Sequence, residues 1–160
     1  MSQLDTQQLM AVYRESNQEN GSIFFPDPST DEQLLRAEDR FLDYLREDFF
    51  QQKDAFYCVW APVGAYQAAL RLEPYRDGLL LEALETKPDA RRKGYATALL
   101  RSVLDHLRTT PYNKVYSHVA KNNVVSLTVH KKCGFQKISD SAVYIDGTVT
   151  QNSVTLCYEL

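Results

Sequence analysis

The sequence predicts an α/β (α+β) fold with a mixed central sheet of about six strands flanked by four helices. Two observations lead to this prediction. In the middle of the chain, three strand-like segments follow one another through tight turns, which is typical of an antiparallel meander. A helix with a clear apolar stripe then separates the third segment from another strand, which is typical of a crossover between parallel strands. The length of 160 residues suits a single domain over residues 1-160.

Two helices and a loop are predicted at the start of the chain. Residues 5 to 16 carry apolar side chains that favour a short helix. Residues 17 to 30 contain two prolines, one glycine and a run of three apolar residues, which predicts a packed loop. Ser29 and Glu32 fit a capping box. Apolar residues at helical spacing then extend the second helix to about residue 52.

Three strands are predicted next. Residues 55–61 are rich in aromatic and β-branched side chains, and residues 65–73 follow after a Pro-Val-Gly turn. An Asp-Gly pair at positions 77 and 78 predicts a hairpin turn into a third strand at 79–87. Pro88 ends this strand, because proline has no N–H to donate to a neighbouring strand.

The most regular helix follows Gly94. Its apolar residues recur at i, i+3, i+4, i+7, i+8 and i+11: Ala96, Leu99, Leu100, Val103, Leu104 and Leu107. A strand at 114–120 comes next, and we expect it to lie beside residues 79–87 and parallel to them.

The last third of the chain predicts a short helix and a hairpin. Residues 123 to 133 form the helix, and Gly134 ends it. Residues 142–145 and 154–160 flank Asp146-Gly147 and predict a closing hairpin.

Composition narrows the classes of function. A formal net charge of −3 argues against a nucleic-acid binder that relies on bulk charge. No apolar run approaches the length of a membrane span, and the first residues lack a signal-peptide core. The three cysteines, Cys58, Cys133 and Cys157, are odd in number and lack a CxxC motif, which is typical of a reducing compartment and gives no metal-site signal. We expect a soluble cytoplasmic domain without nucleic-acid, membrane or metal partners.

The stretch DARRKGYATALL, residues 89–100, places three cations and a glycine at a helix start that has no side-chain cap. Unpaired N–H groups already make a helix start electropositive, so adding cations there is unfavourable unless an external anion supplies the cap. The glycine pattern fits neither a P-loop nor a dinucleotide fingerprint. Solvated surface is the alternative interpretation of the cationic run, and residues 91–94 alone leave both open.

The same stretch resembles a known motif. Arg91, Gly94 and Ala96 form R-x-x-G-x-A, which is similar to the acyl-CoA pyrophosphate loop Q/R-x-x-G-x-G/A of the GNAT superfamily of N-acetyltransferases. The preceding LETKP resembles the family's strand that ends in proline. The predicted GNAT-like order of elements covers almost the whole chain, although the family's first strand is not evident here.

A second segment, NVVSLTVHKKCGF at residues 123–135, resembles the family's N-x-x-A-x-x-L-Y-E-K-x-G-F. The residues that match are Asn123, Lys132, Gly134 and Phe135. Ser126 takes the small-residue position, and His130 stands where tyrosine is common. Two motifs in the right order make the resemblance specific.

The resemblance implies acetyl-CoA as cosubstrate and an amine as acceptor. Gly94 and Ala96 let the backbone approach the phosphates, and the neighbouring amides, hydroxyl and cations complete that site. Backbone groups on the strand and the Asn123 side chain would hold the pantetheine arm. The expected cofactor-binding residues are Leu84, Thr86, Arg91, Arg92, Lys93, Gly94, Tyr95, Ala96, Thr97 and Asn123.

Two strand carboxylates are candidates for the catalytic base. Because strand side chains alternate, Glu82 and Glu85 are expected on opposite faces, with Glu82 on the face of Leu84 and Thr86. This position and face favour Glu82 over Glu85 as the base. The alternative is that either carboxylate only binds substrate or lies at the rim of the sheet.

Among the histidines, His130 is the main candidate, either as proton donor to the CoA thiolate or as the holder of a water that donates; a structural role stays open. His106 on the polar helix face and His118, expected on a sheet surface, are weaker candidates. Tyr75 is a candidate for lining the acceptor pocket.

The leading hypothesis is an acetyl-CoA-dependent N-acetyltransferase acting on a primary amine. The alternative is a non-catalytic acyl-CoA-binding or sensing module with the same fold. By the resemblance, residues 17 to 30 and about 142 to 152 would wall the acceptor site. Acidic residues near the cleft favour a cationic small molecule as acceptor, and the sequence does not indicate whether the protein forms an oligomer.

Overall fold

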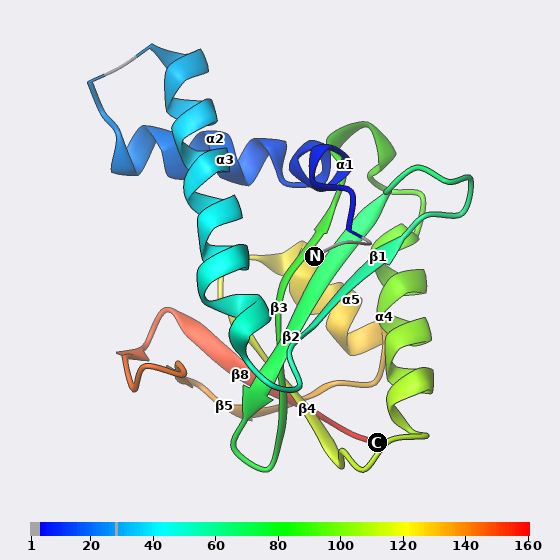
Figure 1. The fold of residues 1–160 in the computed structure, drawn as a ribbon. Coiled ribbons are helices and arrows are strands. Elements are labelled where there is room, and N and C mark those ends of the chain that lie inside the picture. The colour runs from blue at the N-terminus through cyan, green and yellow to red at the C-terminus, as the bar shows by residue number, and fades with distance from the viewer. Residues whose placement is uncertain (1–3, 28) are drawn as a thin grey trace.

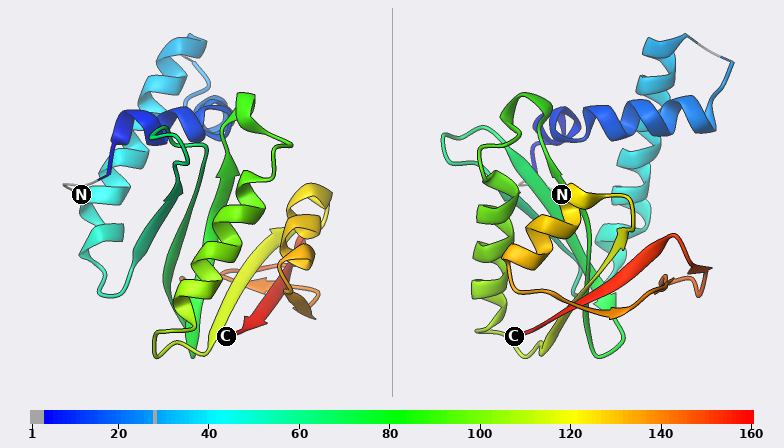
Figure 2. Two further views of the ribbon diagram at one scale, coloured as in Figure 1. Left: turned by 90° about the vertical axis from the view of Figure 1, so that its right-hand side faces the viewer. Right: turned by 180° about the vertical axis from the view of Figure 1, so that it is seen from behind.

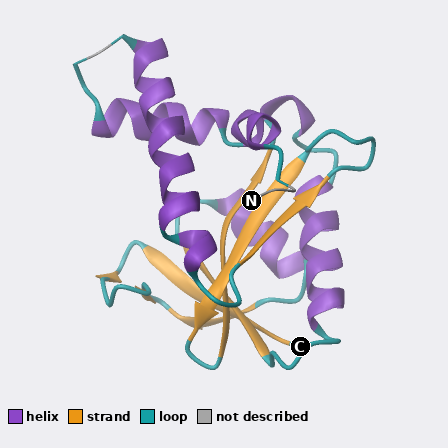
Figure 3. Ribbon diagram, in the orientation of Figure 1, coloured by secondary structure: helices purple, strands orange, loops and turns teal. Residues whose placement is uncertain are grey.

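A computed structural model of the chain describes residues 4–27 and 29–160. Figure 1 shows helices on both sides of one twisted sheet, and Figure 3 colours the same view by secondary structure. The helices are α1 Thr6–Val12, α2 Arg14–Phe24, α3 Thr30–Glu47, α4 Tyr95–Leu107 and α5 Val124–Lys132, with 3-10 turns η1 Phe49–Gln51 and η2 Pro88–Ala90. The strands are β1 Phe56–Trp60, β2 Ala68–Tyr75, β3 Gly78–Thr86, β4 Lys114–Ala120, β5 Gln136–Ser139, β6 Ala142–Val143, β7 Val149–Thr150 and β8 Ser153–Glu159.

The main sheet has six strands in the order β1-β2-β3-β4-β8-β5. β1, β2 and β3 form the expected antiparallel meander, and β3 pairs with β4 in parallel through the crossover helix α4. The predicted mixed sheet and the predicted proximity of residues 79–87 and 114–120 are confirmed. The family's first strand was not evident in the sequence, and the described residues before α1, 4 and 5, form no strand.

Figure 2 shows helices on both faces of the sheet, and each face carries its own apolar cluster. α4 and α5 cover one face, where Leu100 and Leu104 pack on Leu70 and Leu79. α1, α3 and η1 cover the other face with a second cluster that is rich in aromatic side chains. Within the described part of the chain, no helix is both long enough and apolar enough to cross a membrane.

The predicted loop at residues 17–30 is wrong over most of its length, because α2 occupies residues 14–24 and adds a fifth helix. Gly21 allows α2 to cross α3 closely, since a Cβ at this position would lie 2.5 Å from the carbonyl oxygen of Gln33. Ile23 and Phe24 are exposed rather than packed, at 71% and 53%. The glycine therefore marks a contact between two helices, which no local pattern distinguishes from a turn.

The closing hairpin is correct only around its turn. β6 and β7 pair across Asp146-Gly147 as a separate two-stranded sheet, and β8 begins later, at Ser153. β8 pairs instead with β4 and with β5, a strand that the sequence did not predict. β5 is a short edge strand whose first three residues, Gln136 to Ile138, are exposed, so it lacks apolar alternation.

The hairpin between β2 and β3 turns one residue earlier than predicted. Tyr75 pairs with Gly78, so Arg76 and Asp77 form the turn, and Arg76 has a φ of 52°. A side chain at Gly78 would collide with the carbonyl group of Lys114. This glycine is therefore required by the close approach of β4 and not by the turn.

Candidate active site

A cleft opens where β3 and β4 separate. The two strands are in register only from Leu79↔Val115 to Leu81↔Ser117. Beyond Leu81, the edge of β3 that faces β4 has no partner strand among the described elements, and a cavity of about 1010 Å³ lies there. Its walls come from α2, β3, the start of α4, β4 and α5. Glu82, Glu85, His130 and all the expected cofactor-binding residues except Lys93 line this cavity, whereas Tyr75 and His106 do not.

A β-bulge decides which way the two candidate carboxylates point. Ala83 has a φ of 50°, and the pairing with β2 shifts there. Glu82 lies opposite Arg71, and Glu85 lies opposite Ala69. Because Arg71 and Ala69 are two residues apart, they lie on one face of β2, and their partners on β3 do too. The prediction of opposite faces is wrong, because the bulge inserts an extra residue between the two glutamates.

Leu84 and Thr86 lie on the opposite face from the glutamates. Thr86 pairs with Ala68, and Leu84 packs against the apolar cluster under α4 that contains Ala68. The prediction that Glu82 shares their face is therefore also wrong. The carboxylates face the side of α1, α2 and α3, while Leu84 and Thr86 face the side of α4.

Glu82 is held by an arginine. The Nη2 and Nε atoms of Arg71 donate to the same oxygen, Oε2, at 3.0 and 3.2 Å. Arg71 also pairs with the buried Glu73 at 3.3 Å and lies over the ring of Tyr44 at 5.0 Å. Burial raises the pKa of Glu82, and the Arg71 charge opposes that shift. The carboxylate thus enters the cleft with part of its charge balanced.

Glu85 forms the centre of an acidic wall. Glu15, Ser16 and Glu19 of α2 line the same cavity. Burial raises the pKa of Glu85, the nearby Ser16 side chain and the Arg91 charge oppose that shift, and the charges of Glu19 and Glu15 add to it. A cation in the cleft would relieve this crowding of carboxylates.

At the other end of the cleft, α4 starts without a side-chain cap, as predicted. Its N-cap Gly94 has a φ of 83° and makes no side-chain cap hydrogen bond. Arg91 pairs with Glu15 at 2.5 Å, and Lys93 donates to the carbonyl oxygen of Asp89 at 3.2 Å. Arg92 makes no ion pair with any described residue and lines the cavity. The first-turn amides and one free cation thus face the same opening.

α5 presents Asn123 and His130. Asn123 caps the helix by accepting from the Ser126 N–H at 3.0 Å, and both Asn123 and His130 line the cavity. His130 is 1% exposed, and its Nδ1 lies 2.8 Å from the Ser126 carbonyl oxygen. A carbonyl only accepts, so Nδ1 carries the proton and Nε2 a lone pair, for which no described residue provides a partner. Burial lowers the pKa of His130, which favours this neutral form.

The structure also brings His118 into the cavity, from β4. The strand pattern contains a signal for this position. Val115 and Val119 pack in the core under α4, so Tyr116 and His118 must face the other side, toward the acidic wall. Both ring nitrogens of His118 are buried without a partner among the described residues.

The segments expected to wall the acceptor site contribute unequally. Glu19, within residues 17–30, lines the cavity, whereas the lining includes no residue of 142–152. Tyr144 instead packs its ring on His118, with the ring centres 5.1 Å apart. Tyr75 donates its hydroxyl to the carbonyl oxygen of Val143 at 2.5 Å, so it anchors this segment and does not line the cavity.

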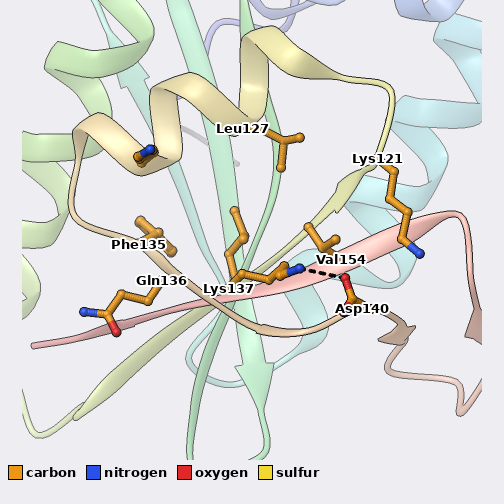
Figure 4. Close-up of a pocket in the computed structure, with 9 residues that line it drawn as sticks. Lys121, Leu127, Phe135, Gln136, Lys137, Asp140 and Val154 are labelled. Carbon is orange, nitrogen blue, oxygen red and sulfur yellow. Dashed lines mark hydrogen bonds and ion pairs between the residues drawn. The ribbon is translucent and has the colours of Figure 1, made fainter.

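A second cavity, of about 590 Å³, lies between α5 and strands β5 and β8. Figure 4 shows Leu127 projecting from α5 on the side opposite Val154 of β8, with Phe135 and Lys121 at the two sides and Lys137 paired to Asp140 at 2.8 Å. It contains none of the site residues predicted from the sequence. Carboxylates, histidines and a helix start all line the first cleft, which is therefore the candidate active site.

One family model matches the chain, and solved structures share its fold. The model of the acetyltransferase (GNAT) family matches residues 12–135. The fold is similar to the PaiA N-acetyltransferase of Thermoplasma acidophilum in complex with coenzyme A, at 15% identity over 98% of this chain and 93% of that chain, with a TM-score of 0.67. No curated protein matches the sequence significantly.

Two further solved structures are similar over 98% of this chain. The ribosomal-protein-S18-alanine N-acetyltransferase of Escherichia coli is 18% identical, with 90% of that chain covered and a TM-score of 0.62. The spermidine N-acetyltransferase of Vibrio cholerae, in complex with CoA and spermine, is 16% identical, with 92% of that chain covered and a TM-score of 0.64. At these identities the likeness shows a shared fold.

Proposed function

The chain belongs to the acetyltransferase (GNAT) family, and from this premise we propose that it transfers the acetyl group of acetyl-CoA to a primary amine of a cationic small molecule. One observation carries the proposal. A single cleft joins an uncapped helix start with a free cation at one end to an acidic wall at the other. The first end suits the phosphates of CoA, and the second suits an ammonium group.

We assign the pyrophosphate to the start of α4. Amides of the first turn and the Thr97 hydroxyl would bind the oxygens, and Arg92 would add a charge-assisted hydrogen bond. Arg91 and Lys93 would contribute longer-range positive charge. The pantetheine arm would lie along the open edge of β3 at Leu84 and Thr86, as an added strand would.

Direct attack accounts for the chemistry. The neutral amine attacks the thioester carbonyl, a C–N bond forms, the C–S bond breaks, and CoA leaves as a thiolate. A backbone N–H near residues 84–86 would stabilise the oxyanion. We assign His130 the second of its two predicted roles: its Nε2 lone pair would hold a water that donates a proton to the thiolate and takes up the proton that the attacking nitrogen loses.

Glu82 and Glu85 would attract and orient the acceptor's ammonium group. The assignment of Glu82 as the base stays a prediction. Glu82 is paired with Arg71. The structural neighbour that holds spermine is one reason to include polyamines among the test acceptors.

We also propose that this single domain acts in the cytoplasm, because its described cysteines are free thiols. No nucleic-acid or membrane partner enters the proposal.

Calorimetry with acetyl-CoA, followed by a free-thiol assay on a panel of mono-, di- and polyamines, tests the proposed function. We expect saturable binding, and CoA release that depends on one class of amine. Tight binding without transfer to any amine would favour the acyl-CoA-sensing alternative, which the pairing of Glu82 with Arg71 also suits. Absence of binding would refute both.

A further inference from the structure

His118 stands at the branch point of the cleft. On β3 and β4, Leu80 pairs with Tyr116, and both lie on the face toward α3. Glu82 and His118 each follow two residues later on that same face. Because the strands separate after Ser117, these two side chains lie on either side of the opening in which the amine and the thioester would meet.

The ring of His118 is oriented but unsatisfied. Tyr75 and Tyr144 pack on it edge to face, at centre distances of 5.5 and 5.1 Å and interplanar angles of 87° and 84°. Neither ring nitrogen reaches a hydrogen-bond partner in the described part of the chain. Leaving a buried polar group unpaired costs about 1–3 kcal/mol, so such groups call for an explanation. A ligand that hydrogen-bonds to the ring would supply one.

The surroundings of His118 keep the ring neutral. Burial lowers its pKa, and the nearby Arg76 charge lowers it further. Tyr75 and Tyr144 pack on the ring, Arg76 lies over the rings of Tyr75 and Tyr116, and Glu82 lines the same cavity. At neutral pH the ring, which lines the cleft, is therefore neutral and carries one unprotonated nitrogen.

Glu82 differs from His118 in this respect. Both nitrogens of the Arg71 fork bind one of its oxygens, and the Arg71 charge balances its own. A carboxylate paired in this way is well placed to hold an ammonium group, and an ordinary carboxylate is a weaker proton acceptor than an ordinary imidazole.

Building on the proposed function, we propose that His118 is the catalytic base, while Glu82 holds the acceptor. The ammonium of the acceptor passes one proton to a free ring nitrogen of His118, directly or through one water. The neutral amine then forms the C–N bond as the C–S bond breaks. The second amine proton goes to the thiolate, and His118 releases the first to solvent, so one acetyl-CoA and one ammonium yield amide, CoA and one proton.

The test compares His118→Gln and His118→Asn with wild type on two kinds of acceptor. With an alkylamine at pH 7, we expect kcat/KM to fall by roughly 10²- to 10⁴-fold, the usual contribution of general base catalysis. With a hydrazide, which is already neutral at pH 7, the loss should be less than about fivefold, because no proton has to be removed first. The alkylamine rate of the variants should also keep rising with pH until the amine itself is neutral.

A matched control is His106→Gln, because His106 is exposed on α4 and does not line the cleft. It should be indistinguishable from wild type. Acetyl-CoA affinity and Tm of the His118 variants should stay close to the wild-type values, and a variant that melts early is replaced by the other one.

Three outcomes separate the possibilities. Full alkylamine activity in the His118 variants overturns this inference and leaves the proposed function standing. An equal loss with both acceptors also overturns it, because His118 would then act only structurally. A wild-type protein that neither binds acetyl-CoA nor acetylates any amine overturns the proposed function, and the role of His118 with it.

Discussion

The two ends of the cleft are built in opposite ways. The end at α4 comes from one short stretch, in which Gly94 turns the chain and the next residues start the helix. The acidic end comes from α2, β3 and β4, which lie far apart in the sequence. The first end is left without a cap of its own, whereas two carboxylates of the second already have partners, Arg71 for Glu82 and Arg91 for Glu15.

Because of this difference, we expect the α4 end to determine acetyl-CoA affinity and the acidic end to determine the reaction of the acceptor. An uncapped helix start gains most from an anion, because backbone N–H groups and the helix dipole act together there. At the acidic end, Glu82 and Glu15 are paired with arginines, Glu19 and Glu85 make no ion pair with a described residue, and both ring nitrogens of His118 lack a partner among the described residues. We therefore expect changes at the α4 end to act on acetyl-CoA binding, and changes at the acidic end to act on the acceptor.

Among changes at the α4 end, Gly94→Val should weaken acetyl-CoA binding the most. The φ of 83° strains any β-branched residue, although a Cβ at this position meets no protein atom within 4 Å. Losing two charge-assisted hydrogen bonds to the pyrophosphate would weaken acetyl-CoA binding on the order of 100-fold. Calorimetry with acetyl-CoA and with pantetheine measures this, and pantetheine, which lacks the pyrophosphate, should bind nearly unchanged.

Gly64→Val is the matched control for that variant. Gly64 has a φ of 80° and equally open surroundings, but it does not line the cleft. Gly64→Val should lose about as much stability as Gly94→Val but should keep the wild-type affinity for acetyl-CoA. If the two variants bind acetyl-CoA equally well, the helix start is not the pyrophosphate site.

At the acidic end, Glu82→Gln should raise the KM of the amine about tenfold and change kcat less, since one carboxylate that holds the ammonium group is lost. Steady-state kinetics against the amine checks this. Glu32→Gln serves as the control, because it removes an exposed carboxylate of α3 that is paired with Arg36 at 2.6 Å. A fall in kcat of roughly 10² or more, with KM unchanged, would return the role of base to Glu82.

A smaller effect should distinguish the cations at the α4 end. Arg92→Ala should weaken acetyl-CoA binding by about three- to tenfold, with the loss shrinking in high salt. Arg91→Ala should do less, because Glu15 already pairs with that side chain. Binding titrations at two salt concentrations measure both, and a larger loss for Arg91 would mean that its pair with Glu15 breaks when CoA binds.

The smallest effect predicted is on stability against pH, at His130. Burial lowers its pKa in the folded protein, whereas in the unfolded chain it titrates near about 6.5. The unfolded state then binds more protons below that pH, so the contribution of His130 to stability falls as the pH drops from neutral toward 5. Denaturant unfolding at several pH values measures this. The free energy of unfolding should fall less steeply with decreasing pH in His130→Phe than in wild type. Parallel curves would mean that His130 keeps its ordinary pKa.

Much of the fold was predictable because its signals are local. The apolar period of α4 and the turn at Asp146-Gly147 each depend on a few neighbouring residues. α2 and β5 were not predicted because they depend on residues that are distant in the sequence. α2 depends on the contact of Gly21 with Gln33 of another helix, and β5 depends on the long strand β8 beside it.

The same division holds within the site. The sequence by itself determined the cationic, uncapped start of α4, because every group that builds it lies within a few residues of Gly94. Only the tertiary structure decided that Glu82 and Glu85 share a face, that Arg71 holds Glu82 and that His118 faces the opening. The physical reason is that one bulge at Ala83 reverses side-chain alternation, and bulges and strand separations are set by pairing between distant segments.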